Sequence, residues 1–165
     1  MSINKRLLTG GKPVYDVRYR GSNGQQFKKT FQTNREAKVF EADQRQSQTN
    51  RTWINPNNSK LTFRTYSTSW LKSRLNLRVR TVELYQGLLA HQILPYFKDI
   101  EIGKLSTGSI RNWYANLLNT GLAQSTVAKA YRLLRTILNS AIEDNLIKVN
   151  PCSIKGAGVA KSPNS

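Results

Sequence analysis

The sequence predicts an α+β fold, in which a small three-stranded antiparallel sheet with one helix precedes an all-α unit of four to five helices. Two observations predict this class. Apolar and charged residues alternate with the period of two that is typical of strands in the first part of the chain. From Leu61 onward, apolar residues recur at the spacing of amphipathic helices. We expect one domain over residues 1–57, a second over residues 58–155 and a linker over residues 156–165.

The first predicted feature is a β-hairpin. Residues 14–20 alternate apolar or aromatic side chains with charged ones, and residues 26–31 resume this pattern. The intervening residues 21–24 contain Gly and Asn, which tolerate a positive φ in a turn. Lys29 falls on the apolar side of the second strand. Either its stem extends past the sheet edge, or the register is shifted by one residue.

A helix and a third strand complete the predicted first domain. Thr33 and Glu36 have the spacing of an N-terminal capping box, so we expect a helix from Thr33 to about Gln48. Residues 51–54, around Trp53, are short and bounded by an Asn-Pro turn. We predict that they return to the sheet as its third strand.

Four amphipathic helices are predicted in the second domain. The second of them is expected to stop near Pro95, and Ser106 is expected to cap the third. The apolar faces place Leu118 inward on the third helix. The apolar stripes of the four helices cover residues 63–71, 82–93, 110–118 and 127–142. The third helix is expected to be closed by Gly121, and the fourth to end before Asn150-Pro151.

The charge of the chain predicts a polyanionic partner. The chain has 26 Lys and Arg residues against 9 Asp and Glu residues, and its net charge is +17. Both halves are basic, so the excess is not confined to a tail. A folded surface with this balance attracts a phosphate polymer in a salt-dependent way. Nucleic acid is therefore the leading candidate. An anionic membrane is the weaker one, because no predicted helix pairs a wide apolar face with exposed Trp or Phe.

Composition also excludes several classes of site. The chain has one cysteine, Cys152, and one histidine, His91, so neither a disulfide framework nor a zinc ligand set is available. No cofactor and no small-molecule substrate are expected. The first residues lack the apolar stretch of a signal peptide, and no apolar run is long enough to span a bilayer. We expect a cytoplasmic protein.

Several stretches, taken together, have the order and spacing of a known family. They are Val14 to Phe31 followed by Thr33-Asn34-Arg35-Glu36-Ala37, Arg80-Thr81-Val82-Glu83-Leu84-Tyr85 through Pro95, and Ser125 to Arg135 with Asn145-Leu146-Ile147 and Asn150-Pro151-Cys152. This arrangement resembles the N-terminal half of the phage-type tyrosine recombinases, the integrases.

The resemblance implies that the partner is double-stranded DNA in a bacterial host. In that family the sheet domain binds arm-type sites through the major groove, and the helical, SAM-like domain binds core-type sites. The family also associates with itself on DNA and continues into a catalytic domain whose tyrosine attacks a phosphate. We expect this chain to end before that domain. We therefore expect no catalytic residue and no enzymatic activity in it.

Ten residues are candidate DNA contacts because they are basic or hydroxylated and lie off the predicted apolar faces. We expect the sheet residues to contact base edges and the helical residues to contact phosphates. For each of them a merely solvated face is the simpler alternative, which the net charge and the resemblance disfavour. The candidates are Arg18, Arg20, Lys28 and Thr30 on the sheet, Arg78, Arg80 and Thr81 at a helix start, and Lys129, Arg132 and Arg135 on the last helix.

Other residues are interpreted as structural. His91 lacks the arginine three residues on that the family's catalytic histidine has, and the three tryptophans lie among apolar neighbours. The expected core tyrosines are Tyr15, Tyr19, Tyr85, Tyr114 and Tyr131.

Two departures from the family pattern and one alternative function remain. Arg78-Val79 and Ala123-Gln124 stand where the family often has a Ser or Thr cap, so Thr81, Ser125 and Thr126 offer alternative helix starts.

The alternative function is a free-standing DNA-binding regulator or competitor at integrase sites, without recombinase activity. An RNA-binding protein is less favoured, because no exposed strand rich in aromatic residues is visible.

Overall fold

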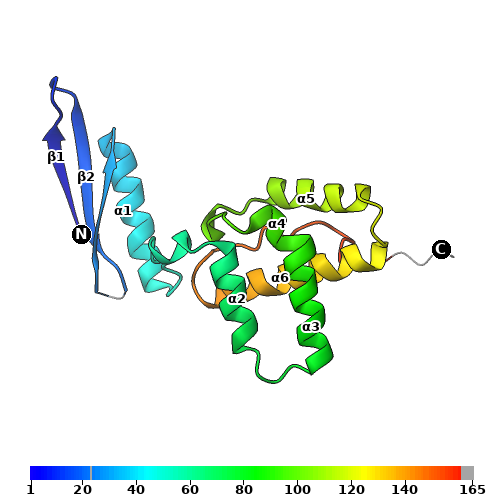
Figure 1. Ribbon diagram of the computed structural model, residues 1–165. Helices are drawn as coiled ribbons and strands as arrows, with labels where there is room; N and C mark the ends of the chain where they lie inside the picture. Colours follow the sequence, from blue (N-terminus) through cyan, green and yellow to red (C-terminus); the bar gives the residue numbers. More distant parts are fainter. Residues whose placement is uncertain (23, 161–165) are drawn as a thin grey trace. The chain divides into compact units, whose positions relative to one another are not determined.

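The computed structural model of the chain describes residues 1–22 and 24–160, which form two compact units. The first unit is Met1–Asn55, and the second begins at Pro56. Figure 1 shows strands and one helix in the first unit and helices in the second, so the predicted α+β class is confirmed. Asn23 of the predicted turn and residues 161–165 of the predicted linker lie outside the described residues.

The sheet has three antiparallel strands, which follow one another in chain order as β1 (Ser2–Leu7), β2 (Pro13–Arg20) and β3 (Gln26–Phe31). In the middle of the sheet, Val17 on β2 lies opposite Ile3 on β1 and Lys29 on β3. Because side chains alternate along a strand, these three residues share one face. The predicted hairpin is thus present as β2 and β3.

The stem of Lys29 extends past the sheet edge, which is the first of the two alternatives predicted for this residue. Its ammonium lies 4.9 Å from the ring centroid of Phe40 and 5.5 Å from that of Phe31, while its side chain remains exposed. The stem therefore passes over apolar neighbours to the sheet edge, and the cation faces the aromatic rings. The register needs no shift.

The third strand is not the segment 51–54 that the sequence predicts. Helix α1 (Asn34–Thr49) ends in a Schellman motif, in which Arg51 takes a left-handed φ of +57°. This turn redirects the chain after the helix. Trp53 then packs on Phe27, with 5.7 Å between the ring centroids, and does not add a strand.

The strand that completes the sheet is β1, at the start of the chain. Ile3 is its one half-buried side chain among the described residues, and Lys5 occupies the next position on the same face. The segment therefore lacks the apolar alternation by which strands are predicted. Backbone pairing with β2 holds this segment in the sheet, although it buries little apolar surface.

Helix α1 covers one face of the sheet. Thr33 accepts a hydrogen bond from the amide of Glu36 at 3.2 Å, so the predicted N-cap is present. The reciprocal bond from the Glu36 side chain, which would complete the predicted capping box, is not formed among the described residues. Ala37 and Val17 are fully buried where the helix meets the sheet. The aromatic side chains that pack around them are Tyr15, Tyr19, Phe27, Phe31 and Phe40.

The second unit contains five α-helices among the described residues, together with short 3-10 and π-helical turns. The bounds are η1 (Asn58–Lys60), α2 (Phe63–Ser73), α3 (Val79–Leu88), η2 (Leu89–Ile93), α4 (Leu94–Phe97), η3 (Ile102–Lys104), α5 (Thr107–Asn119) and α6 (Gln124–Glu143).

The second predicted helix ends at Phe97, close to the predicted stop at Pro95. It continues from α3 through η2, a π-helical turn, into α4, where Pro95 lies in the first turn. A proline has no N–H to donate to the preceding turn, and a π-helical turn changes the hydrogen-bond spacing at this point. Trp113 on α5 donates its indole N–H to the carbonyl of Gln92 at 2.7 Å, which satisfies one acceptor in the π turn.

Helix α6 lies at the centre of the helical core. Its predicted apolar stripe is buried from Val127 to Ala141, as at Leu134 and Leu138, and Ile142 at the end of the stripe is half-buried. Ser106 forms a reciprocal capping box at the start of α5, so its predicted role is confirmed. Leu118 is the exception, because it is 42% exposed and lies one position beyond the buried face of α5.

Two predictions about segment ends differ from the structure. Helices α3 and α6 begin directly after Arg78 and Ala123, and neither residue makes a side-chain cap bond within the described part of the chain. The alternative starts at Thr81, Ser125 and Thr126 lie inside the first helical turns. The linker does not begin at residue 156, because Ala157 is only 2% exposed and belongs to the helical core.

Candidate nucleic-acid interface

The open face of the sheet has polar and basic side chains from all three strands. Arg18 on β2 lies opposite Ser2 on β1 and Lys28 on β3, and Arg20 lies opposite Gln26. Since every second residue of a strand points to the same side, these side chains share the face that α1 does not cover. The structure therefore brings together all the sheet candidates, which are Arg18, Arg20, Lys28 and Thr30.

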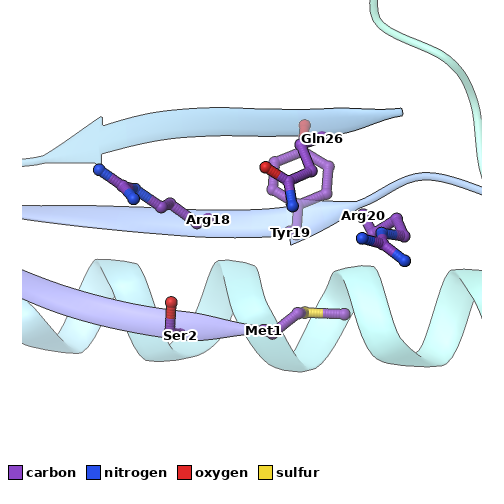
Figure 2. Close-up of a pocket in the computed structure, with 6 residues that line it drawn as sticks. All are labelled: Met1, Ser2, Arg18, Tyr19, Arg20 and Gln26. Atoms are coloured by element: carbon purple, nitrogen blue, oxygen red, sulfur yellow. The ribbon is translucent and has the colours of Figure 1, made fainter. Parts of the chain in front are cut away.

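A shallow hollow of about 370 Å³ lies on this face. Figure 2 shows Arg18 and Arg20 among its lining residues, with Ser2 on one neighbouring strand and Gln26 on the other. Both arginines are exposed, and neither forms an ion pair with a residue that the structure describes. Guanidinium, amide and hydroxyl groups together match the hydrogen-bonding groups of base edges and phosphates.

A buried carboxylate, that of Asp16, lies between two other cations of this face, Arg6 and Lys28. Asp16 is 6% exposed and accepts hydrogen bonds from the Thr30 hydroxyl at 2.6 Å and from Nε of Arg6 at 3.1 Å. The ammonium of Lys28 lies 3.9 Å from the same carboxylate. The Thr30 hydrogen bond, followed by that of Arg6, holds the pKa of Asp16 below its ordinary value. Asp16 is therefore ionised at neutral pH.

The sequence did not indicate Arg6 or Asp16 as site residues. Arg6 lies on β1, the strand that alternation failed to predict, and Asp16 is an acid on a face predicted from its bases. The usable signal was the polar run Ser2, Asn4 and Arg6 at alternate positions. This run places three polar side chains on the same face as Arg18.

A second hollow, of about 360 Å³, lies between α3 and α6. Thr81 and Tyr85 line it from α3, and Lys129 and Arg132 line it from α6. Both cations are exposed and form no ion pair with the described residues. Unpaired cations beside a hydroxyl group can bind a phosphate oxygen, because each supplies donors and positive charge.

Three further candidates lie outside this hollow. Arg78 directly precedes α3, and Arg80 is exposed in its first turn. Arg135 is one turn beyond Arg132, and each three-residue step moves a side chain by about 60° around a helix. Its charge lies near the Cys152 thiol. Burial raises the pKa of this thiol to about 12, and the positive charge of Arg135 opposes part of the shift.

The tyrosines expected in the core are buried or half-buried. Burial raises the pKa of the Tyr19 and Tyr131 hydroxyls, and the Tyr131 hydroxyl accepts a hydrogen bond from the amide of Ile154 at 2.9 Å. His91 is exposed in the π turn.

No helix within residues 1–22 and 24–160 is long and apolar enough to cross a membrane.

The helical unit matches a known protein family. The family described as "Phage integrase, N-terminal SAM-like domain" matches residues 62–118, from the N-cap of α2 to the last turn of α5. The protein named as a prophage phiRv2 integrase in Mycobacterium tuberculosis H37Rv is 31% identical over 154 residues, which cover 89% of this chain and 40% of that protein. The integrase of Mycobacterium phage L5 is 28% identical over 134 residues, which cover 76% and 35%. This chain therefore spans well under half of the length of these relatives.

Two solved structures have a similar fold. An integrase-like domain from Bacillus cereus, determined by NMR, is 28% identical with a TM-score of 0.57, and the match covers 62% of this chain and 86% of that domain. A lambda integrase dimer bound to a COC′ core site has a TM-score of 0.56, and the match covers 96% of this chain and 46% of that one. At 19% identity, the second likeness concerns the fold alone.

Proposed function

Because the chain belongs to the phage integrase family, we propose that it binds double-stranded DNA as the N-terminal part of a site-specific integrase. Residues 1–57 bind an arm-type site, and residues 58–155 bind a core-type site. The observation that supports this most directly is the pair of exposed arginines, Arg18 and Arg20, on the open face of the sheet, neither of which has an ion-pair partner among the described residues. Self-association on the DNA of a bacterial host belongs to the same proposal.

The sheet unit is suited to the major groove. That groove admits a β-ribbon, and arginine and glutamine are the side chains that pair with guanine and adenine edges there. Arg18, Arg20 and Gln26 lie together on the open face. Lys28 and Thr30 complete the proposed contact surface, although the Thr30 hydroxyl hydrogen is already donated to Asp16. We infer that this face contacts bases.

The helical unit is suited to the phosphate backbone. Lys129 and Arg132 lie across the hollow from Thr81 and have no acidic partner within the described residues. Contacts of this kind position a protein on DNA and supply affinity that depends on salt. Arg78 and Arg80 at the start of α3 and Arg135 on α6 lie outside the hollow, and we assign them further phosphate contacts in the same proposal. We infer that this unit mainly grips phosphates.

Joining the two units in one chain increases avidity. Binding by one unit makes binding by the other intramolecular, at an effective concentration set by the connecting segment. We assign no strand-transfer step to these residues. The tyrosines expected in the core, such as Tyr131, are buried or half-buried, so their hydroxyls are poorly accessible to a phosphate.

A selection from random duplex DNA tests the proposed function. It uses the full chain and two double variants, Arg18→Ala with Arg20→Ala and Lys129→Ala with Arg132→Ala. We expect the full chain to enrich sequence motifs, and the first double variant to lose the arm-type motif. The second should retain that motif with weaker binding. If the full chain enriches no motif above a salt-sensitive background, the proposal of site-specific binding is wrong.

Lys129→Ala is expected to weaken binding to all duplexes alike. Loss of one phosphate contact should reduce the slope of log K against log salt by about 1. Titration of a selected and a random duplex over a range of salt concentrations measures both effects. The control is Lys104→Ala, because the Lys104 ammonium is already paired with Glu101 at 3.2 Å. An unchanged slope for Lys129→Ala, or an equal decrease for the control, contradicts the phosphate contact.

A further inference from the structure

We propose that Arg6 contacts a guanine edge in the arm-type site and that Asp16 is the positioning residue that orients it. The inference rests on the proposed function of the sheet face and adds a strand and a base contact to it. Arg6 lies on β1 and Asp16 on β2, and both project from the open face. The pair is close enough to form a direct hydrogen bond, at 3.1 Å.

The atoms used in this bond decide what Arg6 can still do. Arg6 donates through Nε, and its terminal amino groups form no bond with any residue that the structure describes. The side chain is 51% exposed, so these groups are accessible. A guanidinium presents its donors in a rigid planar fork, and the commonest specific base contact is such a fork on O6 and N7 of guanine. Arg6 therefore keeps donors for a guanine while its orientation is fixed.

Asp16 is itself held in place from the other side. The Thr30 hydroxyl on β3 donates to one carboxylate oxygen at 2.6 Å, while Arg6 uses the other. The carboxylate thus joins three strands, and it is only 6% exposed. Fixing a side chain before binding removes part of the entropy lost on association. Thr30 thus fixes Asp16, and Asp16 fixes Arg6 in the orientation that we propose for the base contact.

The negative charge of Asp16 also gives Arg6 a different electrostatic environment from that of the other arginines on the open face. Arg18 and Arg20 have no carboxylate partner among the described residues, so a phosphate can pair with them freely. Beside Arg6, the Asp16 carboxylate repels a phosphate but not an uncharged base. Specificity arises from this kind of repulsion as well as from attraction. Asp16 thus favours a base over the backbone at this position.

The test is a selection from random duplex DNA with the full chain, Arg6→Ala, Asp16→Asn and the double variant. We expect both single variants to relax the same base-pair position, with a loss of preference of about 5- to 150-fold. The double variant should lose no more than either single variant, because the two residues act as one unit. Asp16→Asn should not weaken binding to random duplex, since it removes a negative charge from the face.

Two additional variants separate positioning from stability. Arg6→Lys keeps the charge but has no planar fork, so we expect it to relax the same position without loss of folding. Glu41→Gln on α1 removes a carboxylate paired with Arg45 away from the open face, and the motif should remain unchanged. Thermal unfolding followed by circular dichroism reports the folding of each variant.

The outcomes distinguish the inference from the proposed function. If the wild-type chain selects a motif that Arg6→Ala leaves intact, or that Asp16→Asn weakens equally at all positions, the inference is wrong and the proposed function stands. Wild-type protein that selects no motif overturns both.

Discussion

Replacing Arg18 with alanine is expected to reduce the preference for a selected duplex over random duplex by about 5- to 150-fold. Arg18 lies in the middle strand between Ser2 and Lys28, and its guanidinium is unpaired among the described residues. A bidentate contact with a base is lost only on the correct sequence, so affinity for random duplex should decrease much less. Competition binding with both duplexes at a fixed salt concentration measures the ratio.

The matched control for this prediction is Arg35→Ala. Arg35 is exposed on α1, which covers the other face of the sheet, and its removal changes the net charge by the same amount. We expect a small loss on both duplexes and an unchanged ratio. Equal losses on selected and random duplex for Arg18→Ala would show that Arg18 contacts phosphate and not a base.

Replacing Trp113 with alanine is expected to destabilise the helical unit by about 3–5 kcal/mol. Trp113 is 1% exposed, and its ring centroid lies 5.6 Å from that of Phe97. The substitution leaves a large cavity and also removes the donor of the 2.7 Å bond to the Gln92 carbonyl in the π turn. Urea unfolding followed by circular dichroism measures the change. Since small domains have about 5–15 kcal/mol of stability in total, this loss is a large fraction of the stability of the unit.

Leu118→Ala, on the same helix, provides the comparison. Leu118 is 42% exposed, so its replacement should change the unfolding free energy by no more than about 0.5 kcal/mol. Comparable losses for the two variants would contradict the assignment of the α5 faces.

The elements that the sequence predicted well are those with a strong apolar period or a side-chain cap. The hairpin around Val17, the helix capped by Thr33 and the long stripe of α6 have such signals. The third strand could not be predicted from the same signals, because β1 is stabilised by pairing with β2 and has little apolar surface of its own. The aromatic content of residues 51–54 reflects packing of Trp53 beside the sheet.

The candidate site was predictable to a similar extent. Exposed cations such as Arg18 and Lys129 could be identified because they lie off periodic apolar faces. Which cations share a surface depends on strand register and helix rotation. Thr81 on α3 and Arg132 on α6 are separated in the chain by α4 and α5, so their meeting could be found only in the tertiary structure. The contact of Asp16 with Arg6 required the β1–β2 register in the same way.

The two outer strands of the sheet have a consequence for the free protein. In the described part of the chain β1 and β3 are the edges of the sheet, and unpaired edges are templates on which other chains can add strands and aggregate. Each edge has adjacent cations, Lys5 with Arg6 and Lys28 with Lys29. Two like-charged edges repel each other. The charges that we propose for DNA thus also oppose β-aggregation while DNA is not bound.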